Sequence, residues 1–145
     1  KPFSRILFPT DFSETGAKAL KRAIALTEDM DAELFVLHVI DDTLISTHVE
    51  EERHIILKEL RKHALEEMRK HLPKHLMENF ETIGAVKRGE PGKAICSYAE
   101  THHCDLIVMG THGRTGIERA LIGSVADKVV RRAKSSVYLV RPGKM

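Results

Sequence analysis

The sequence lacks the cysteine content of disulfide-rich secreted proteins and the long apolar runs of membrane proteins. It has no tryptophan, two cysteines and no apolar run close to the roughly 20 residues of a membrane span. Two cysteines form no disulfide framework, so Cys96 and Cys104 are expected to be reduced, half-buried thiols of a cytoplasmic protein. The net charge is only +2, which argues against nucleic acid as a partner. We expect one domain spanning residues 1–145, with no signal peptide and no membrane association.

Five short segments predict the strands of a sheet. Four are continuous apolar runs, which suit strands buried on both faces of a parallel sheet, and one alternates more and predicts a strand near an edge. In chain order they are RILFP at 5–9, ELFVLHVI at 33–40, the alternating FETIGAVKRG at 80–89, DLIVM at 105–109 and SVYLV at 136–140.

Helical patterns lie between these segments. Ser13 can cap a first helix, and a stripe of apolar residues from 57 to 72 marks a long charged helix that Pro73 ends. Pro91 opens a third helix and Ser124 a fourth. The alternation of strands and helices predicts an α/β fold, a doubly wound parallel sheet with helices on both faces. In such folds, ligands bind outside the carboxyl ends of the strands.

One glycine-rich stretch falls at that edge, between the fourth strand and the last helix. Gly110 ends the strand, where a side chain would block close approach, and Gly113 suits a turn with positive φ. Gly123 and Ser124 follow at the start of the helix, whose N–H groups favour anions. A ligand could also accept a bond from the Ser124 hydroxyl and meet the charge of Arg114. These residues together predict a phosphate cradle.

The same residues also fit an interpretation without a ligand. Ser124 and Asp127 have the spacing of a capping box, and the charge of Asp127 would repel an anion. Gly110 and Gly113 could simply turn the chain. Spacing alone leaves both interpretations open, because short motifs also occur by chance.

The spacing Gly110-x2-Gly113-x9-Gly123-Ser124 resembles the ATP-binding signature of the universal stress protein family, G-x2-G-x9-G-[ST]. The stretches RILFPTDFSE, LHVID and SVYLVRP extend the resemblance over essentially the whole chain. The resemblance implies a Rossmann-like, five-stranded parallel sheet in the order 3-2-1-4-5, the adenine-nucleotide alpha-hydrolase-like fold. It also implies a stress-response protein that binds ATP and forms a homodimer through the C-terminal strand, Ser136 to Val140.

The resemblance implies roles for residues at the ends of three strands. Asp11 would bond the ribose hydroxyls, with Pro9 and Thr10 bordering the same pocket. The backbone of Val39 would read the adenine edge, and Met109 would form the pocket floor. Independently, a carboxylate directly after a buried strand costs energy unless something bonds it. The alternative role for Asp11 is a cap for the first helix.

The remaining implied residues surround the ribose and the phosphates: Gly110, His112, Gly113, Arg114, Gly123, Ser124 and Val125. Mg²⁺ would be held mainly by phosphate oxygens, with no protein metal site, as is typical when phosphates are present. No catalytic residue is predicted, because no nucleophile–base pair stands out. We therefore expect a nucleotide-dependent switch or sensor, with a slow ATPase or self-phosphorylating protein as the alternative.

Two further patterns have simpler explanations. SETG at 13–16 resembles the FMN loop of flavodoxins, but Lys18 replaces the closing threonine, and few aromatic residues are available to hold a flavin. Ser13 is better explained as a helix cap. Histidines and glutamates also recur every four residues between Glu59 and His75, but lysine and arginine lie among them, which favours a solvated helix face over a metal site.

Overall fold

The computed structural model describes residues 2–78, 83–112 and 122–142 of the chain. Its five strands form one parallel sheet in the order β3-β2-β1-β4-β5. The strands are β1 (Arg5–Pro9), β2 (Glu33–Asp41), β3 (Gly84–Gly89), β4 (Leu106–Gly110) and β5 (Ser136–Val140). This order and the parallel pairing confirm the predicted α/β fold, with β3 at one edge and β5 at the other.

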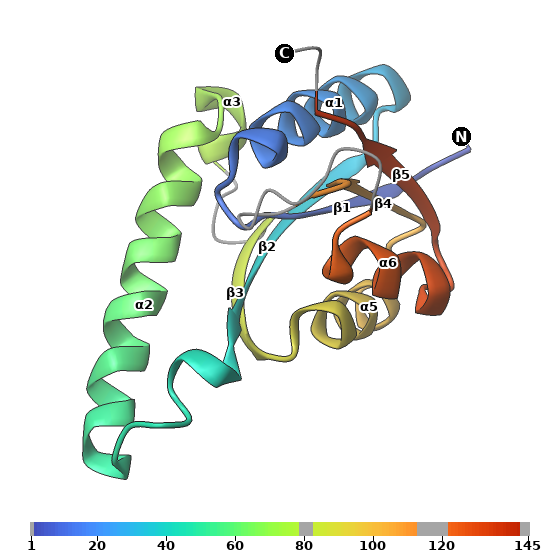
Figure 1. Ribbon diagram of the computed structural model, residues 1–145. Helices are drawn as coiled ribbons and strands as arrows, with labels where there is room; N and C mark the ends of the chain where they lie inside the picture. Colours follow the sequence, from blue (N-terminus) through green and yellow to red (C-terminus); the bar gives the residue numbers. More distant parts are fainter. Residues whose placement is uncertain (1, 79–82, 113–121, 143–145) are drawn as a thin grey trace.

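Helices cover both faces of the sheet (Figure 1). One face carries α1 (Glu14–Met30), α2 (Glu50–His71) and the short α3 (Lys74–Met77), and the other carries α5 (Pro91–Thr101) and α6 (Ser124–Arg132). A 3-10 turn, η1 (Asp42–Leu44), follows β2 and precedes α2. Among the described residues, no helix is both long and apolar enough to cross a bilayer.

Strand β1 shows why the predicted strands are continuous apolar runs. Ile6 and Phe8 belong to the hydrophobic cluster under α1 and α2, whereas Leu7 between them belongs to the cluster under α5. Successive side chains of a strand point to opposite faces. Because both faces are covered, both sets of side chains must be apolar.

Several helix ends lie where the sequence predicts them. The Ser13 hydroxyl accepts a hydrogen bond from the N–H of Gly16 at 3.1 Å and caps α1. Pro91 starts α5, and α2 ends at His71, directly before Leu72 and Pro73. Cys96 and Cys104 are free thiols, but Cys104 is buried and not half-buried as expected, and burial raises the pKa of its thiol to about 11.

The N-terminus of α6 differs from the capping-box interpretation. Gly123 is the N-cap, and the helix has no side-chain cap hydrogen bond. Ser124 is therefore the first helical residue, one position too late for a capping box with Asp127. The carboxylate of Asp127 instead accepts a hydrogen bond from Arg131 Nε at 3.0 Å. Capping does not account for the presence of serine at position 124.

Candidate functional site

A cavity of about 320 Å³ lies at the carboxyl ends of β1, β2 and β4, beside the start of α6. It brings together every predicted site residue that the structure describes, from segments far apart in the sequence. These lining residues are Pro9, Thr10, Asp11, Val39, Met109, Gly110, His112, Gly123, Ser124 and Val125. Gly113 and Arg114 lie outside the described residues. The strand ends thus identified the edge of the sheet at which a cavity lies.

The turn between β1 and α1 holds the candidate carboxylate. Asp11 Oδ1 accepts a hydrogen bond from the N–H of Ser13, and Thr10 Oγ1 accepts one from the N–H of Phe12, both at 3.0 Å. Phe12 has a positive φ of 65°, which is uncommon for a bulky residue. Asp11 does not have the alternative role of capping α1, because Ser13 is the N-cap; its carboxylate bonds the turn before the helix. One such bond does not exclude a ligand, because a carboxylate has about four acceptor positions.

Two side chains at the end of β2 line the cavity without having been predicted. His38 Nδ1 lies 2.8 Å from the carbonyl oxygen of Thr10, and the His38 ring centroid lies 4.7 Å from that of Phe12. Asp41 Oδ1 accepts hydrogen bonds from the N–H and the hydroxyl of Thr43, both at 3.0 Å. Their position at a strand end was the only signal in the sequence, and it does not tell which side chains face the cavity.

Gly110 ends β4 at the point where α1 approaches most closely. A Cβ atom at Gly110 would lie 2.7 Å from Cγ2 of Thr15, so helix packing is a second reason for glycine there, beside the expected ligand approach. The next two residues are buried, with Thr111 6% and His112 7% exposed. Thr111 Oγ1 lies 3.0 Å from His112 Nδ1. This pair places the ring of His112 in the wall of the cavity.

The first turn of α6 borders the cavity with its backbone. Gly123, Ser124 and Val125 line the cavity, and N–H groups in the first turn of a helix lack intrahelical acceptors. They carry the positive end of the helix dipole, which favours an anion. The pairing of Asp127 with Arg131 offsets the repulsion that the Asp127 charge would exert on such an anion.

Helix α5 supplies an apolar wall. Pro91 and Ile95 line the cavity together with Met109 of β4. Lys128 Nζ of α6 lies 2.8 Å from Glu90 Oε1 at the start of α5, and this hydrogen bond lowers the pKa of the Glu90 carboxyl. The ion pair joins the two helices whose first turns border the cavity.

A model of the universal stress protein family matches residues 2–141. The chain belongs to this family. The chain is 34% identical to universal stress protein MJ0531 of Methanocaldococcus jannaschii over 98% of this chain and 84% of that one. The solved structure of MJ0577 from the same organism is 31% identical, covers 100% of both chains and superposes with a TM-score of 0.85. A universal stress protein from Archaeoglobus fulgidus, solved in complex with dAMP, is 20% identical over 97% of this chain and 100% of that one, with a TM-score of 0.59.

The cavity of this universal stress protein combines three chemical surfaces. Ile95 and Met109 form an apolar wall, Asp11 adds a carboxylate at the turn after β1, and the first turn of α6 adds N–H donors. An apolar wall suits a flat ring, a carboxylate accepts hydrogen bonds from hydroxyl groups, and a helix N-terminus favours an anion. The arrangement can therefore bind a ligand that carries all three groups.

Proposed function

We propose that this universal stress protein binds ATP in the cavity at the strand ends and acts as a nucleotide-dependent switch or sensor. The observation that carries the proposal is that three signature residues, Gly110, Gly123 and Ser124, border one cavity with Asp11. The cavity volume of about 320 Å³ lies within the usual range of small-molecule sites, about 300–1,000 Å³.

The chemistry of the wall supports one orientation of the nucleotide. The adenine ring would lie against the apolar wall near Val39 and Met109, and Asp11 would accept hydrogen bonds from the ribose hydroxyls. The phosphates would lie at the first turn of α6, against Gly123 and Ser124. Gly113 and Arg114 complete the proposed phosphate contacts on the grounds of the sequence motif alone.

Mg²⁺ fits this site through the phosphates. It keeps several waters and is usually held by phosphate oxygens with one or two carboxylates. When bound, it would neutralise phosphate charge beside the N–H groups of α6. The Archaeoglobus fulgidus relative holds dAMP, but a likeness of 20% identity shows the fold alone, so the proposal rests on the residues of this chain.

A switch is favoured over a fast ATPase by the state of the carboxylates. Asp11 and Asp41 line the cavity, and each accepts hydrogen bonds from its own turn. Rapid hydrolysis needs a residue that positions the attacking water, whereas this proposal assigns the Asp11 carboxylate to the ribose hydroxyls. Slow hydrolysis or self-phosphorylation is the second candidate. Single-turnover assays with ATP and Mg²⁺ distinguish these reactions from binding without turnover.

Titration calorimetry with ATP and Mg²⁺ tests the proposal. We expect saturable binding of one ATP for each chain and a rise in the unfolding temperature, because a ligand bound to the native state stabilises it. FMN serves as the comparison ligand for the flavodoxin-like alternative. Absence of both heat and thermal stabilisation at millimolar ATP would refute ATP binding.

The substitution Gly123→Val tests the position of the phosphates. Gly123 has φ −61° and ψ 157°, a conformation open to any residue, so valine should leave the fold intact while filling space needed by the phosphates. We expect loss of ATP binding with an unchanged circular dichroism spectrum. Ser124→Ala should cost less, about 0.5–1.5 kcal/mol for one hydrogen bond. Ile122→Val, at the preceding residue, is the control that should bind ATP normally. If Gly123→Val also binds ATP normally, the start of α6 does not contact the phosphates.

A further inference from the structure

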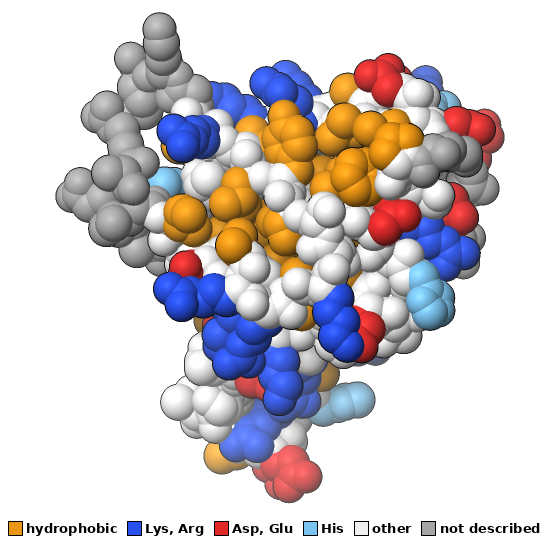
Figure 2. Space-filling model, turned by 90° about the vertical axis from the view of Figure 1, so that its right-hand side faces the viewer, with side chains coloured by type: hydrophobic (Ala, Val, Ile, Leu, Met, Phe, Trp, Pro, Cys, Tyr) orange, Lys and Arg blue, Asp and Glu red, His pale blue; other side chains and the backbone are white. Residues whose placement is uncertain are grey.

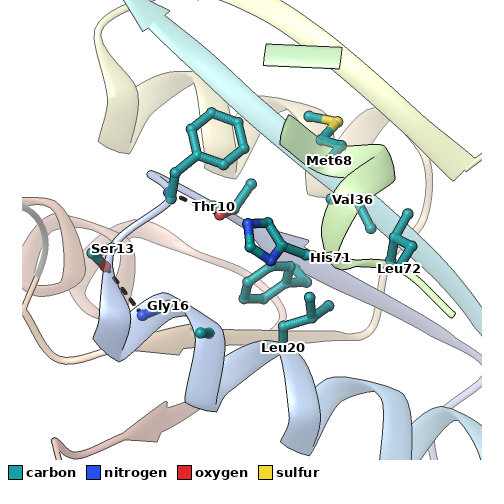
Figure 3. A pocket seen from close by; sticks show the side chains of 11 residues that line it. Thr10, Ser13, Gly16, Leu20, Val36, Met68, His71 and Leu72 are labelled. Atoms are coloured by element: carbon teal, nitrogen blue, oxygen red, sulfur yellow. Dashed lines mark hydrogen bonds between the residues drawn. The ribbon is translucent and has the colours of Figure 1, made fainter. Parts of the chain in front are cut away.

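A second cavity, of about 180 Å³, lies on the face of the sheet that α1 and α2 cover (Figure 3). Ser13, Gly16 and Leu20 of the α1 segment face Val36 of β2 across it, and Met68, His71 and Leu72 at the end of α2 complete the wall. The cavity shares its border residues Thr10, Ser13 and Gly16 with the cavity at the strand ends. It is otherwise lined by a separate set of side chains.

The cavity opens to solvent on one side, although several of its apolar lining residues, such as Phe8, Val36 and Met68, are buried. Cores are packed about as densely as organic crystals, and voids larger than a water molecule are few. Gly16 and Ala17, which carry at most one side-chain carbon, line the cavity from α1, and Val36 and Met68 line it from β2 and α2. An apolar cavity of about 150 Å³ is large enough to bind benzene, so this one has room for a single ring.

Water is a poor occupant of this cavity. A bound water needs roughly two to four polar partners, and most of the lining is aliphatic or aromatic. The hydroxyl groups of Thr10 and Ser13 lie at the border shared with the other cavity, and each oxygen accepts one backbone hydrogen bond, so few polar partners face the apolar part of the space. The ring of His71 points toward the cavity, and its side chain is 55% exposed, so it lies at the mouth.

The lining favours an aromatic occupant. Phe8, which is 1% exposed, and Phe12 lie in the wall, and aromatic rings attract one another in edge-to-face and offset arrangements. Met68 adds a thioether, which makes favourable contacts with ring edges. With no Lys, Arg, Asp or Glu among the described residues of this wall, the occupant should carry no charge.

We propose that this cavity is a binding site for an uncharged monocyclic aromatic molecule. The ring lies between Leu20 of α1 and Met68 of α2, against the side chain of Phe8. A single hydroxyl substituent on the ring would point toward the mouth at His71. This proposal does not rest on the proposed ATP binding, so its test uses protein without nucleotide.

Methyl-resolved NMR with benzene as the probe tests the site. We expect saturable shifts of the methyl resonances of Leu20, Val36 and Met68, caused by the ring current of the bound probe. Ala17→Leu fills the cavity from α1 and should weaken benzene binding at least tenfold. Ala17 and Lys18 are both exposed, but only Ala17 lines the cavity. Lys18→Leu introduces the same side chain at the next position of α1 and should leave the affinity unchanged.

The outcomes separate clearly. If Ala17→Leu does not fold, the smaller Ala17→Val takes its place and should show an intermediate loss of affinity. The proposal is overturned if the methyl shifts grow linearly with benzene without saturating. It is also overturned if the folded filling variant and Lys18→Leu bind benzene equally well.

Discussion

At the scale of single residues, two aspartates provide a matched pair. Asp11 lies two residues after β1, and Asp41 is the last residue of β2. Both line the same cavity and accept a hydrogen bond from the N–H group two residues on. An asparagine at either position keeps an acceptor for that turn bond while removing the charge. The proposed contact with the ribose hydroxyls is therefore the feature that should distinguish the two residues.

We expect Asp11→Asn to weaken ATP binding and Asp41→Asn to leave it nearly unchanged. Hydrogen bonds to charged groups contribute about 1 kcal/mol more than neutral ones, which corresponds to roughly a fivefold rise in Kd. Calorimetry with both variants measures this difference. The effect of Asp11→Asn should shrink when 2′-deoxy-ATP replaces ATP, since one hydroxyl is then missing. Equal losses in the two aspartate variants would contradict the ribose contact.

At the scale of elements, β5 is an edge strand of mostly apolar composition. It pairs with β4 on one side, and Val137, Tyr138 and Leu139 are each half-buried. Figure 2 looks onto the side of the molecule where β5 lies and shows hydrophobic side chains gathered there. Exposed strand edges are templates for pairing. The homodimer implied by the family resemblance, with antiparallel pairing of β5 about a two-fold axis, stays a prediction that fits this edge.

Proline substitutions in β5 test the dimer, and the structure tells the two positions apart. The N–H of Ser136 donates to Asp105, and the carbonyl of Val140 accepts from Thr111. Alternate residues of a strand point their N–H groups to opposite edges. The N–H of Tyr138 therefore points to β4, and the N–H of Leu139 points away from the sheet. Tyr138→Pro should therefore lower the unfolding temperature, whereas Leu139→Pro should fold and lose the dimer.

Light scattering at micromolar concentration measures the oligomeric state of both variants. Wild-type protein should have the mass of a dimer, and folded Leu139→Pro that of a monomer. A monomeric wild type, or a folded Leu139→Pro that stays dimeric, would exclude β5 as the interface.

At the scale of the whole molecule, the two cavities share the turn between β1 and α1. Thr10, Ser13 and Gly16 border both, and this turn includes Phe12 at positive φ. A ligand that orders the shared turn reduces the entropy that a second ligand must lose. The two proposed sites should therefore be coupled.

We expect saturating benzene to tighten ATP binding about fivefold, a typical lower bound for coupled sites. Linkage requires that ATP tighten benzene binding by the same factor. Calorimetry of each ligand with and without the other measures both factors. Ala17→Leu should abolish the effect while keeping ATP binding. Unchanged affinities in both directions would show that the cavities act independently.

Local chemistry alone determined the order of the elements. Apolar runs such as 5–9 predicted buried parallel strands because both faces of the sheet had to be covered. Ser13, Pro73 and Pro91 marked helix ends because each acts through its own backbone geometry or through neighbours a few residues away. The glycine spacing and Asp11 placed the candidate site at an edge of the sheet where the structure has a cavity.

Tertiary packing decided the features that depend on residues distant in sequence. Gly110 must be glycine partly because Thr15 of α1 lies against it, a contact that no local pattern contains. His38 faces the cavity through its contact with Thr10, and the second cavity exists only where α1 meets the end of α2. The direction of a side chain and the space left between side chains are decided when separate elements pack. The pattern of apolar residues in the sequence therefore predicts the elements and the edge of the sheet where a ligand would bind, but not which residues line the cavities.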